Sequence, residues 1–162
     1  MTRDEAAALL YREALHLDRR EWDEWLALYA EDAVFWIPAW KSETEQTCDP
    51  DREMSLVYYH GRRNLEDRVI RIRSGQSPAS TPLPRTVHAV TNVLVTASAT
   101  DAVETSASWT VHRYDTRRKD AHVFFGLYEH RLERRDGEWL IARKKVLLMN
   151  DIVPTVLDVY AF

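Results

Sequence analysis

Cysteine is nearly absent from this chain of 162 residues, which contains only Cys48. A single thiol cannot close a disulfide bond within the chain, and this agrees with a reducing compartment. It also excludes a Rieske cluster, which needs two cysteines and two histidines, and a structural zinc site built from several cysteines. The six histidines include no closely spaced pair such as HxxxH, so the sequence does not indicate a mononuclear iron site with two histidine ligands.

Glycine, basic residues and long apolar runs are also scarce. The four glycines form no GxGxxG or GxxxxGKS/T loop that would bind phosphates. The net charge of −4 argues against a nucleic-acid binder, which normally carries a basic excess. No apolar run is long enough to cross a bilayer, and the N-terminal stretch MTRDEAAALLYREAL lacks the apolar core of a secretory signal. We therefore expect a cytoplasmic protein that binds neither nucleic acid nor membranes.

Helical spacing is the main pattern in the first half of the chain. Thr2 and Glu5 form a capping-box signature, which predicts a first helix that runs to about Leu17. A short second helix with an aromatic face is predicted from the i, i+3, i+4, i+7 spacing of Trp22, Trp25, Leu26 and Tyr29. The other elements predicted here are a strand at Ala33–Ile37, a long loop at 39–54, a short strand at Ser55–Tyr59 and a third helix at Asn64–Arg73.

The second half of the chain changes to the period-two alternation of strands. Four long strands are predicted, separated by short polar turns: Val87–Ala99, Val103–Tyr114, Ala121–Arg134 and Glu138–Met149. Successive hairpins make an antiparallel meander, and helices followed by strands indicate an α+β class. We expect one domain, residues 1–162, with three N-terminal helices packed on a curved, mostly antiparallel sheet. This element order resembles the cone-shaped nuclear-transport-factor-2-like (cystatin-like) fold.

The predicted cone could hold a small cluster of titratable side chains. With a turn centred near Asp101, His88 and His112 point to the same face of neighbouring strands. Tyr29, Asp32 and Tyr58 could approach the open end of the same cone. These groups could perform acid–base chemistry if burial moved their pKa values toward neutrality. One hypothesis is therefore a stand-alone lyase or isomerase that uses Asp32, His88 and a tyrosine. The alternatives are histidines with a structural role, or a binding module without chemistry.

Two C-terminal features each leave two interpretations open. Positive charges crowd the last predicted hairpin at Arg131, Arg134, Arg135, Arg143, Lys144 and Lys145, and they suit either a solvated edge or an ion-pair surface between subunits. The apolar segment Ile152–Phe162 is either a final strand on its own domain or a segment that packs against a neighbouring subunit.

Four segments carry a family resemblance that covers nearly the whole chain. They are REWDEWLALYAEDAVFWIPAW (20–40), DREMSLVYYHGRRNLEDRVIRIRSG (51–75), PRTVHAVTNVLV (84–95) and LYEHRLERRDGEWLIARKKVLLMND (127–151). These segments resemble beta subunits of aromatic-ring-hydroxylating dioxygenases, in the branch that acts on benzoate, toluate, anthranilate and 2-halobenzoate. The SLVYYHGRRNLEDRV and RTVHAVTNV stretches are the most specific.

The resemblance implies a structural subunit with no catalytic, cofactor-binding or metal-binding residue of its own. A large alpha subunit would hold a Rieske cluster and a mononuclear iron, and a flavin-containing reductase would pass it electrons from NADH. The holoenzyme would convert benzoate-like acids to cis-dihydrodiols. The beta subunit would form a trimer within a hexamer of three alpha and three beta chains.

Overall fold

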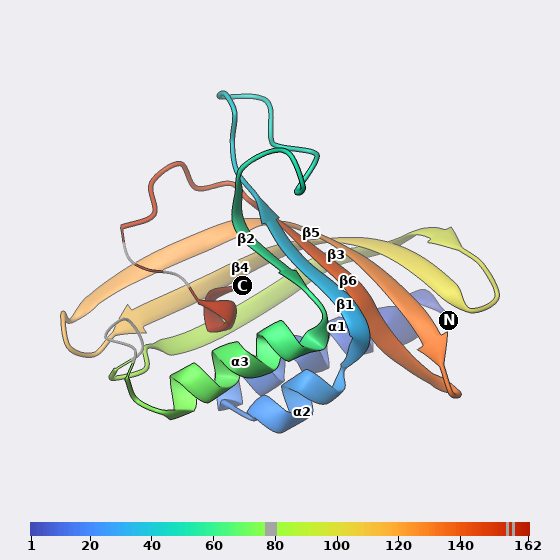
Figure 1. Cartoon of the computed structure of the whole chain (residues 1–162), viewed down its shortest axis with the longest axis horizontal. Helices are drawn as coiled ribbons and strands as arrows, with labels where there is room; N and C mark the ends of the chain where they lie inside the picture. The colour runs from blue at the N-terminus through green and yellow to red at the C-terminus, as the bar shows by residue number, and fades with distance from the viewer. Residues whose placement is uncertain (77–80, 155, 157) are drawn as a thin grey trace.

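The computed structural model describes residues 1–76, 81–154, 156 and 158–162. This part of the chain forms α-helices and a six-stranded sheet in the α+β arrangement expected from the sequence (Figure 1). The helices are α1 (Arg3–Arg19), α2 (Trp22–Ala27) and α3 (Arg62–Arg73). The strands are β1 (Tyr29–Pro38), β2 (Ser55–His60), β3 (Arg85–Ser98), β4 (Ala102–Asp115), β5 (Asp120–Arg135) and β6 (Glu138–Leu148).

Helix α1 begins at the predicted capping box and ends two residues after the predicted Leu17. The Thr2 side chain accepts a hydrogen bond from the Glu5 backbone N–H, and the Glu5 carboxylate accepts one from the Thr2 backbone N–H at 2.6 Å. This is the reciprocal capping box. The helix stops at Arg20, whose left-handed backbone (φ 61°) closes the last turn. Its buried face includes Leu10 and Leu17, which pack into the core.

The second helix is shorter than predicted, because Tyr29 belongs to a strand. Helix α2 ends at Ala27, and Tyr29 opens β1, where it lies opposite Ile141 of β6. The Ile141 backbone N–H donates to the Leu28 carbonyl at 2.8 Å. The helical spacing of the aromatic residues therefore continues two residues past the helix only by coincidence. Pairing with a distant strand overrides the local pattern.

The four C-terminal strands form the expected antiparallel meander. Strands β3, β4, β5 and β6 pair in sequence order, and β1 joins β6 in parallel, which gives the order β2-β1-β6-β5-β4-β3. The β5–β6 turn is the Asp136-Gly137 pair, and both residues have positive φ (51° and 90°). Such backbone values are those of a type I′ turn, which suits the twist of a hairpin.

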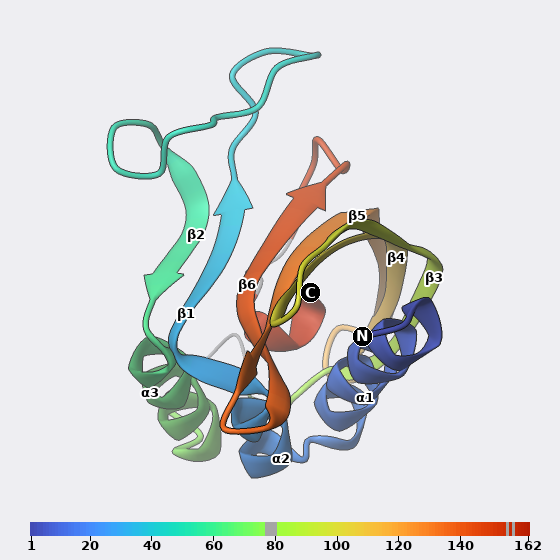
Figure 2. The same cartoon turned by 90° about the vertical axis from the view of Figure 1, so that its right-hand side faces the viewer.

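The sheet curves over the helices and closes a cone, as Figure 2 shows. Helix α1 packs beside β3, while α2 and α3 lie against β1. The predicted cone of three helices on a curved, mostly antiparallel sheet is thus confirmed. Within the described residues, none of the helices is both long enough and apolar enough to cross a membrane.

The end of the chain lies inside this cone and not at an edge of the sheet. Among the described residues of the segment, Val159–Ala161 form a 3-10 helix, η2, whose side chains are buried. The prediction of a final strand is therefore wrong for these residues, although packing on their own domain is right. The cone interior offers no free strand edge to this segment, whereas a compact turn fits between α1 and the sheet (Figure 2).

Candidate functional site

The two histidines that we expected to share a face lie on opposite faces of the sheet. His88 pairs with Val111, a fully buried inner residue, while His112 pairs with Val87 and is exposed. The prediction fails because the β3–β4 turn is centred between Thr100 and Asp101, as the pairing of Ser98 with Val103 shows, and the two one-residue register shifts in β3 together leave the faces unchanged. A change of one residue in the pairing, which is what a half-residue change in the turn centre produces, turns the side chains of a strand to the other face.

Asp32 and Tyr58 also lie away from the cone interior. The Asp32 carboxylate is 62% exposed and pairs with Arg135 at 3.3 Å. Tyr58 pairs with Trp36, whose neighbours Phe35 and Ile37 point into the core, so Tyr58 faces outward. The structure therefore does not bring Tyr29, Asp32, Tyr58, His88 and His112 together as one pocket.

Tyr29 does lie inside the cone, in a network centred on Glu13. The Tyr29 hydroxyl donates to Glu13 Oε1 at 2.7 Å, and Trp25 Nε1 donates to the same oxygen at 3.1 Å. The Lys144 ammonium donates to both Glu13 oxygens, at 2.7 and 2.9 Å, and to the Phe162 carbonyl at 3.1 Å. Both charged residues are fully buried. The network thus joins α1, β1 and β6 to the C-terminal segment.

Burial and pairing act in opposite directions on this ion pair. Burial raises the pKa of Glu13, but the Lys144 charge and the hydrogen bonds from Lys144 and Tyr29 outweigh it and hold that pKa below its ordinary value. Burial lowers the pKa of Lys144, and the Glu13 carboxylate offsets part of this effect. A carboxylate held by three donors is a poor general base, so the network suits a structural role.

His130 extends the network but carries no charge at neutral pH. Burial, reinforced by the nearby Lys144 ammonium, lowers the pKa of His130 to about 3. Neither ring nitrogen has a hydrogen-bond partner among the described residues, and the hydroxyl of Thr105, directly opposite on β4, is also unpaired. A histidine that stays neutral far below pH 7 cannot exchange protons as an acid–base catalyst there.

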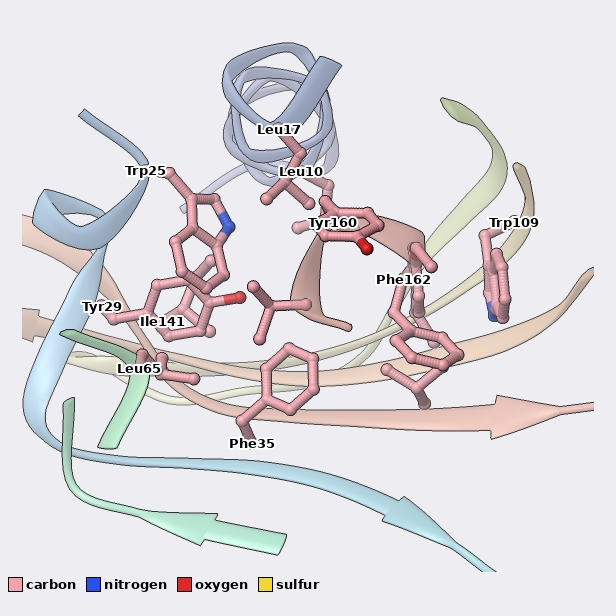
Figure 3. Packing of buried hydrophobic residues seen from close by; sticks show 14 of the residues in the cluster. Leu10, Leu17, Trp25, Tyr29, Phe35, Leu65, Trp109, Ile141, Tyr160 and Phe162 are labelled. Carbon is pink, nitrogen blue, oxygen red and sulfur yellow. The ribbon is translucent and has the colours of Figure 1, made fainter. Parts of the chain in front are cut away.

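Side chains of the C-terminal segment pack inside the cone. Figure 3 shows Tyr160 and Phe162 between α1 and the sheet, with Phe162 facing Trp109. The Phe162 and Trp109 rings meet edge to face at 6.1 Å, and Trp109 stacks on Tyr128 at 5.1 Å. Asp158 anchors the segment through Arg68 of α3, whose Nε donates to its carboxylate at 3.2 Å. The lyase or isomerase hypothesis requires an open pocket in the part of the cone that these aromatic rings occupy.

Sequence reasoning missed Glu13 and Lys144 as the centre of the cone. Both carried a readable signal. Glu13 is in helical phase with Leu10, Ala14 and Leu17, so its carboxylate had to lie on the buried face of α1. Lys144 alternates in phase with the buried Val146 of β6. As one of the six positive charges of the last hairpin, Lys144 is expected from the sequence to be exposed to solvent.

The outer face of the sheet carries an exposed apolar band. The band consists of Val87 and Leu94 of β3 and Val123, Phe125 and Leu127 of β5. Two of the hairpin charges beside it are already paired within the chain, because Arg131 and Arg143 both contact Glu104 of β4, at 3.0 and 2.9 Å. Val123, Phe125 and Leu127 follow one another along the outer face of β5, and neighbouring exposed apolar side chains of this kind mark protein–protein interfaces.

No cluster of three or more potential metal ligands occurs among the residues that the structure describes. Cys48 is a free, exposed thiol in the connection between β1 and β2. Its backbone N–H is bound by the Glu53 carboxylate at 2.6 Å.

Comparison with known proteins gives a consistent result over almost the whole chain. A family model described as "Ring hydroxylating beta subunit" matches residues 12–155. The 2-halobenzoate 1,2-dioxygenase small subunit of Burkholderia cepacia is 41% identical over 96% of this chain and 93% of that protein. The toluate 1,2-dioxygenase subunit beta of Pseudomonas putida is 40% identical over 93% and 92%.

A solved structure agrees with the sequence matches. The beta subunit of the benzoate 1,2-dioxygenase from Burkholderia mallei is 33% identical, with a TM-score of 0.81 that covers 98% of this chain and 96% of that one. The resemblance inferred from the four sequence segments is thereby confirmed. The chain belongs to the family of ring-hydroxylating dioxygenase beta subunits.

Proposed function

We propose that this chain is the small, non-catalytic subunit of a ring-hydroxylating dioxygenase that converts benzoate-like aromatic acids to cis-dihydrodiols. The observation that carries the proposal is the match of residues 12–155 to the beta-subunit family. Relatives that are 35–41% identical are small subunits of 2-halobenzoate, toluate, benzoate and anthranilate 1,2-dioxygenases. The placement of the groups supports the proposal, because the side chains that the lyase or isomerase alternative needs do not meet in one place among the described residues.

The iron chemistry belongs on the alpha subunit in this proposal. A Rieske cluster takes two cysteine and two histidine ligands, and this chain has one cysteine in total. Its donor set therefore does not fit the cluster. The alpha subunit would hold the Rieske cluster and the mononuclear iron, and a flavin-containing reductase would deliver electrons from NADH.

The contribution of this chain would be assembly. We propose that residues 1–162 act as one domain that joins an alpha subunit and forms a trimer within a hexamer of three alpha and three beta chains. The exposed apolar band on β3 and β5 supports such contacts, since subunit interfaces bury apolar side chains at their centre. A threefold ring closes through contacts between two different surfaces of each copy. The cytoplasmic location stays a prediction.

Coexpression with the alpha subunit tests this function. The tagged chain should copurify with alpha, and the complex should absorb visible light as an iron–sulfur protein does. If this chain and the alpha subunit purified separately at every ionic strength tried, that result would contradict the proposal.

A further inference from the structure

The outer face of the sheet divides into an uncharged end and a charged end. Strand pairing gives three adjacent rows at the uncharged end, and none of their residues is acidic, a lysine or an arginine. Exposed apolar side chains gather there, and Val87 and Phe125 are 63% and 48% exposed. We call these rows the uncharged patch, which consists of Val87, His112 and Val123; Ala89, Thr110 and Phe125; and Thr91, Ser108, Leu127 and Leu147.

The charged end of the same face is already paired within the chain. Lys145 contacts Glu129 at 3.3 Å. Glu104 contacts both Arg131 and Arg143, at 3.0 and 2.9 Å. The uncharged patch is therefore the part of this face that gains free energy when another surface covers it, because removal of apolar surface from water is favourable.

A second exposed apolar surface follows β6, between the sheet and the buried end of the chain. Ile152, Val153 and Val156 are 79%, 38% and 64% exposed, whereas Val159–Ala161 and Phe162 are buried in the cone. Packing on its own domain therefore accounts for the end of the C-terminal segment but not for Ile152, Val153 and Val156, which we call the arm.

The arm leaves the sheet directly beside the uncharged patch. The Asn150 side chain accepts a hydrogen bond from the Phe125 backbone N–H and donates one to the Val123 carbonyl, both at 3.1 Å. Figure 1 shows residues 149–154 looping away from the end of β6. One copy thus presents two different apolar surfaces at the same end of the molecule. A ring closes when one surface of each copy meets a different surface of the next copy, so the arm and the patch are the two surfaces that a ring requires.

Unpaired charges of opposite sign flank the arm and the patch. Asp151, at the start of the arm, is exposed, and its carboxylate forms no ion pair among the described residues. Arg85 lies opposite Tyr114, one row beyond the patch, and Arg117 lies in the turn that follows β4. Both arginines are exposed, and neither has an ion-pair partner in the part of the chain that the structure describes. A second copy therefore offers the patch both an apolar surface and a charge that complements its rim.

We propose that the arm of one copy packs on the uncharged patch of the next copy, and that this contact closes the ring of beta subunits. The chain itself carries both halves of the contact, so the alpha subunit is not needed to cover the patch. The inference rests on the proposed beta-subunit function for the ring of three, and it names the two surfaces that hold this ring together. Apolar side chains would lie at the centre of the contact and charges at its rim, as in other subunit interfaces.

Two variants of the full-length chain, each damaged on a different surface, test this contact. Phe125→Asp damages the patch and Ile152→Asp damages the arm, so each variant alone should show the mass of one copy by size-exclusion chromatography with light scattering. Because Ile152 is so exposed, its substitution should leave thermal unfolding unchanged. Coexpressed under different tags, the two variants should copurify, because the intact arm of the Phe125→Asp chain meets the intact patch of the Ile152→Asp chain.

Ile70→Asp is the matched control for the arm variant. Ile70 is 64% exposed on α3, away from both surfaces, so this variant should keep the mass of three copies. Asp151→Asn should weaken the ring at low ionic strength and have a smaller effect in high salt, because salt screens exposed charges.

Three results would overturn the inference: an Ile152→Asp chain that keeps the mass of three copies, a natural chain with the mass of one copy, or two damaged variants that do not copurify. In each case the proposed beta-subunit function still stands if the natural chain copurifies with alpha.

Discussion

At the scale of single residues, Glu13 and Lys144 are the most consequential pair in the molecule. They are opposite charges with no access to solvent, and each is the main partner of the other. Lys144→Met should lower the free energy of unfolding by about 3–5 kcal/mol, because it leaves the Glu13 carboxylate buried without a counter-charge. Urea unfolding measures this loss.

The double variant Glu13→Leu/Lys144→Met is the control for that prediction. With both charges gone, no buried ion is left unpaired, so most of the lost stability should return. If the double variant lost as much stability as Glu13→Leu and Lys144→Met lose together, the pair would not act as a unit.

His130 makes the stability of the chain depend on pH. Burial and Lys144 lower its folded pKa to about 3, while an unfolded histidine titrates near about 6.5. Between these values the unfolded chain binds a proton that the folded chain excludes. The free energy of unfolding should therefore fall as the pH drops through this window, by at most about 1.4 kcal/mol per pH unit.

Urea unfolding of His130→Leu at about pH 7 and about pH 5 isolates this effect. In this variant, the difference in the free energy of unfolding between the two pH values should be much smaller than in the natural chain. His112→Leu, at an exposed histidine, should keep it. Equal pH dependence in both variants would assign the effect to other groups.

The sequence predicted the helices and strands better than it predicted which side chains contact one another. The four titratable side chains proposed beside Tyr29 lie on different faces, because a half-residue difference in the centre of a turn decides which face each residue of the strand occupies. Two bulges in β3 carry no strong sequence signal, although Asn92 at the first of them has a positive φ of 54°. Which partner each group meets is decided by the three-dimensional structure.

At the scale of elements, the C-terminal segment works as part of the core. Phe162 is 2% exposed and packs on Trp109. Phe162→Ala should lower the free energy of unfolding by about 3–5 kcal/mol, as truncation of a buried phenylalanine usually does. Phe125→Ala, at a ring of the same size that is 48% exposed on the outer face, should cost much less. A similar loss for the two variants in chemical denaturation would contradict the placement of the C-terminal segment.

Elements with a strong period were predictable, and those set by distant contacts were not. The four long strands alternate over many residues, so β3 to β6 were expected near their observed bounds. The helix-to-strand change before Tyr29 depends on pairing with Ile141, and the turn at Val159–Ala161 depends on the cone around it. The local sequence indicates neither of these contacts.

At the scale of the whole molecule, the outer face of the sheet should decide assembly. Phe125→Asp places a charge in the apolar band and should disrupt association with alpha or with other copies, while the isolated chain stays folded. Size-exclusion chromatography with light scattering on the coexpressed complex measures this. Asp101→Lys, a charge change at the β3–β4 turn outside the band, serves as the control and should assemble normally. An intact Phe125→Asp complex would show that the band is not an interface.

The central claim is that this chain supports oxygen insertion into an aromatic ring without performing it. Iron content and benzoate turnover, measured on the purified chain alone and on its complex with alpha, test that claim directly. We predict no stoichiometric iron and no turnover for the chain alone, and both for the complex supplied with its reductase and NADH. Tightly bound iron or product formation in the chain alone would contradict this account.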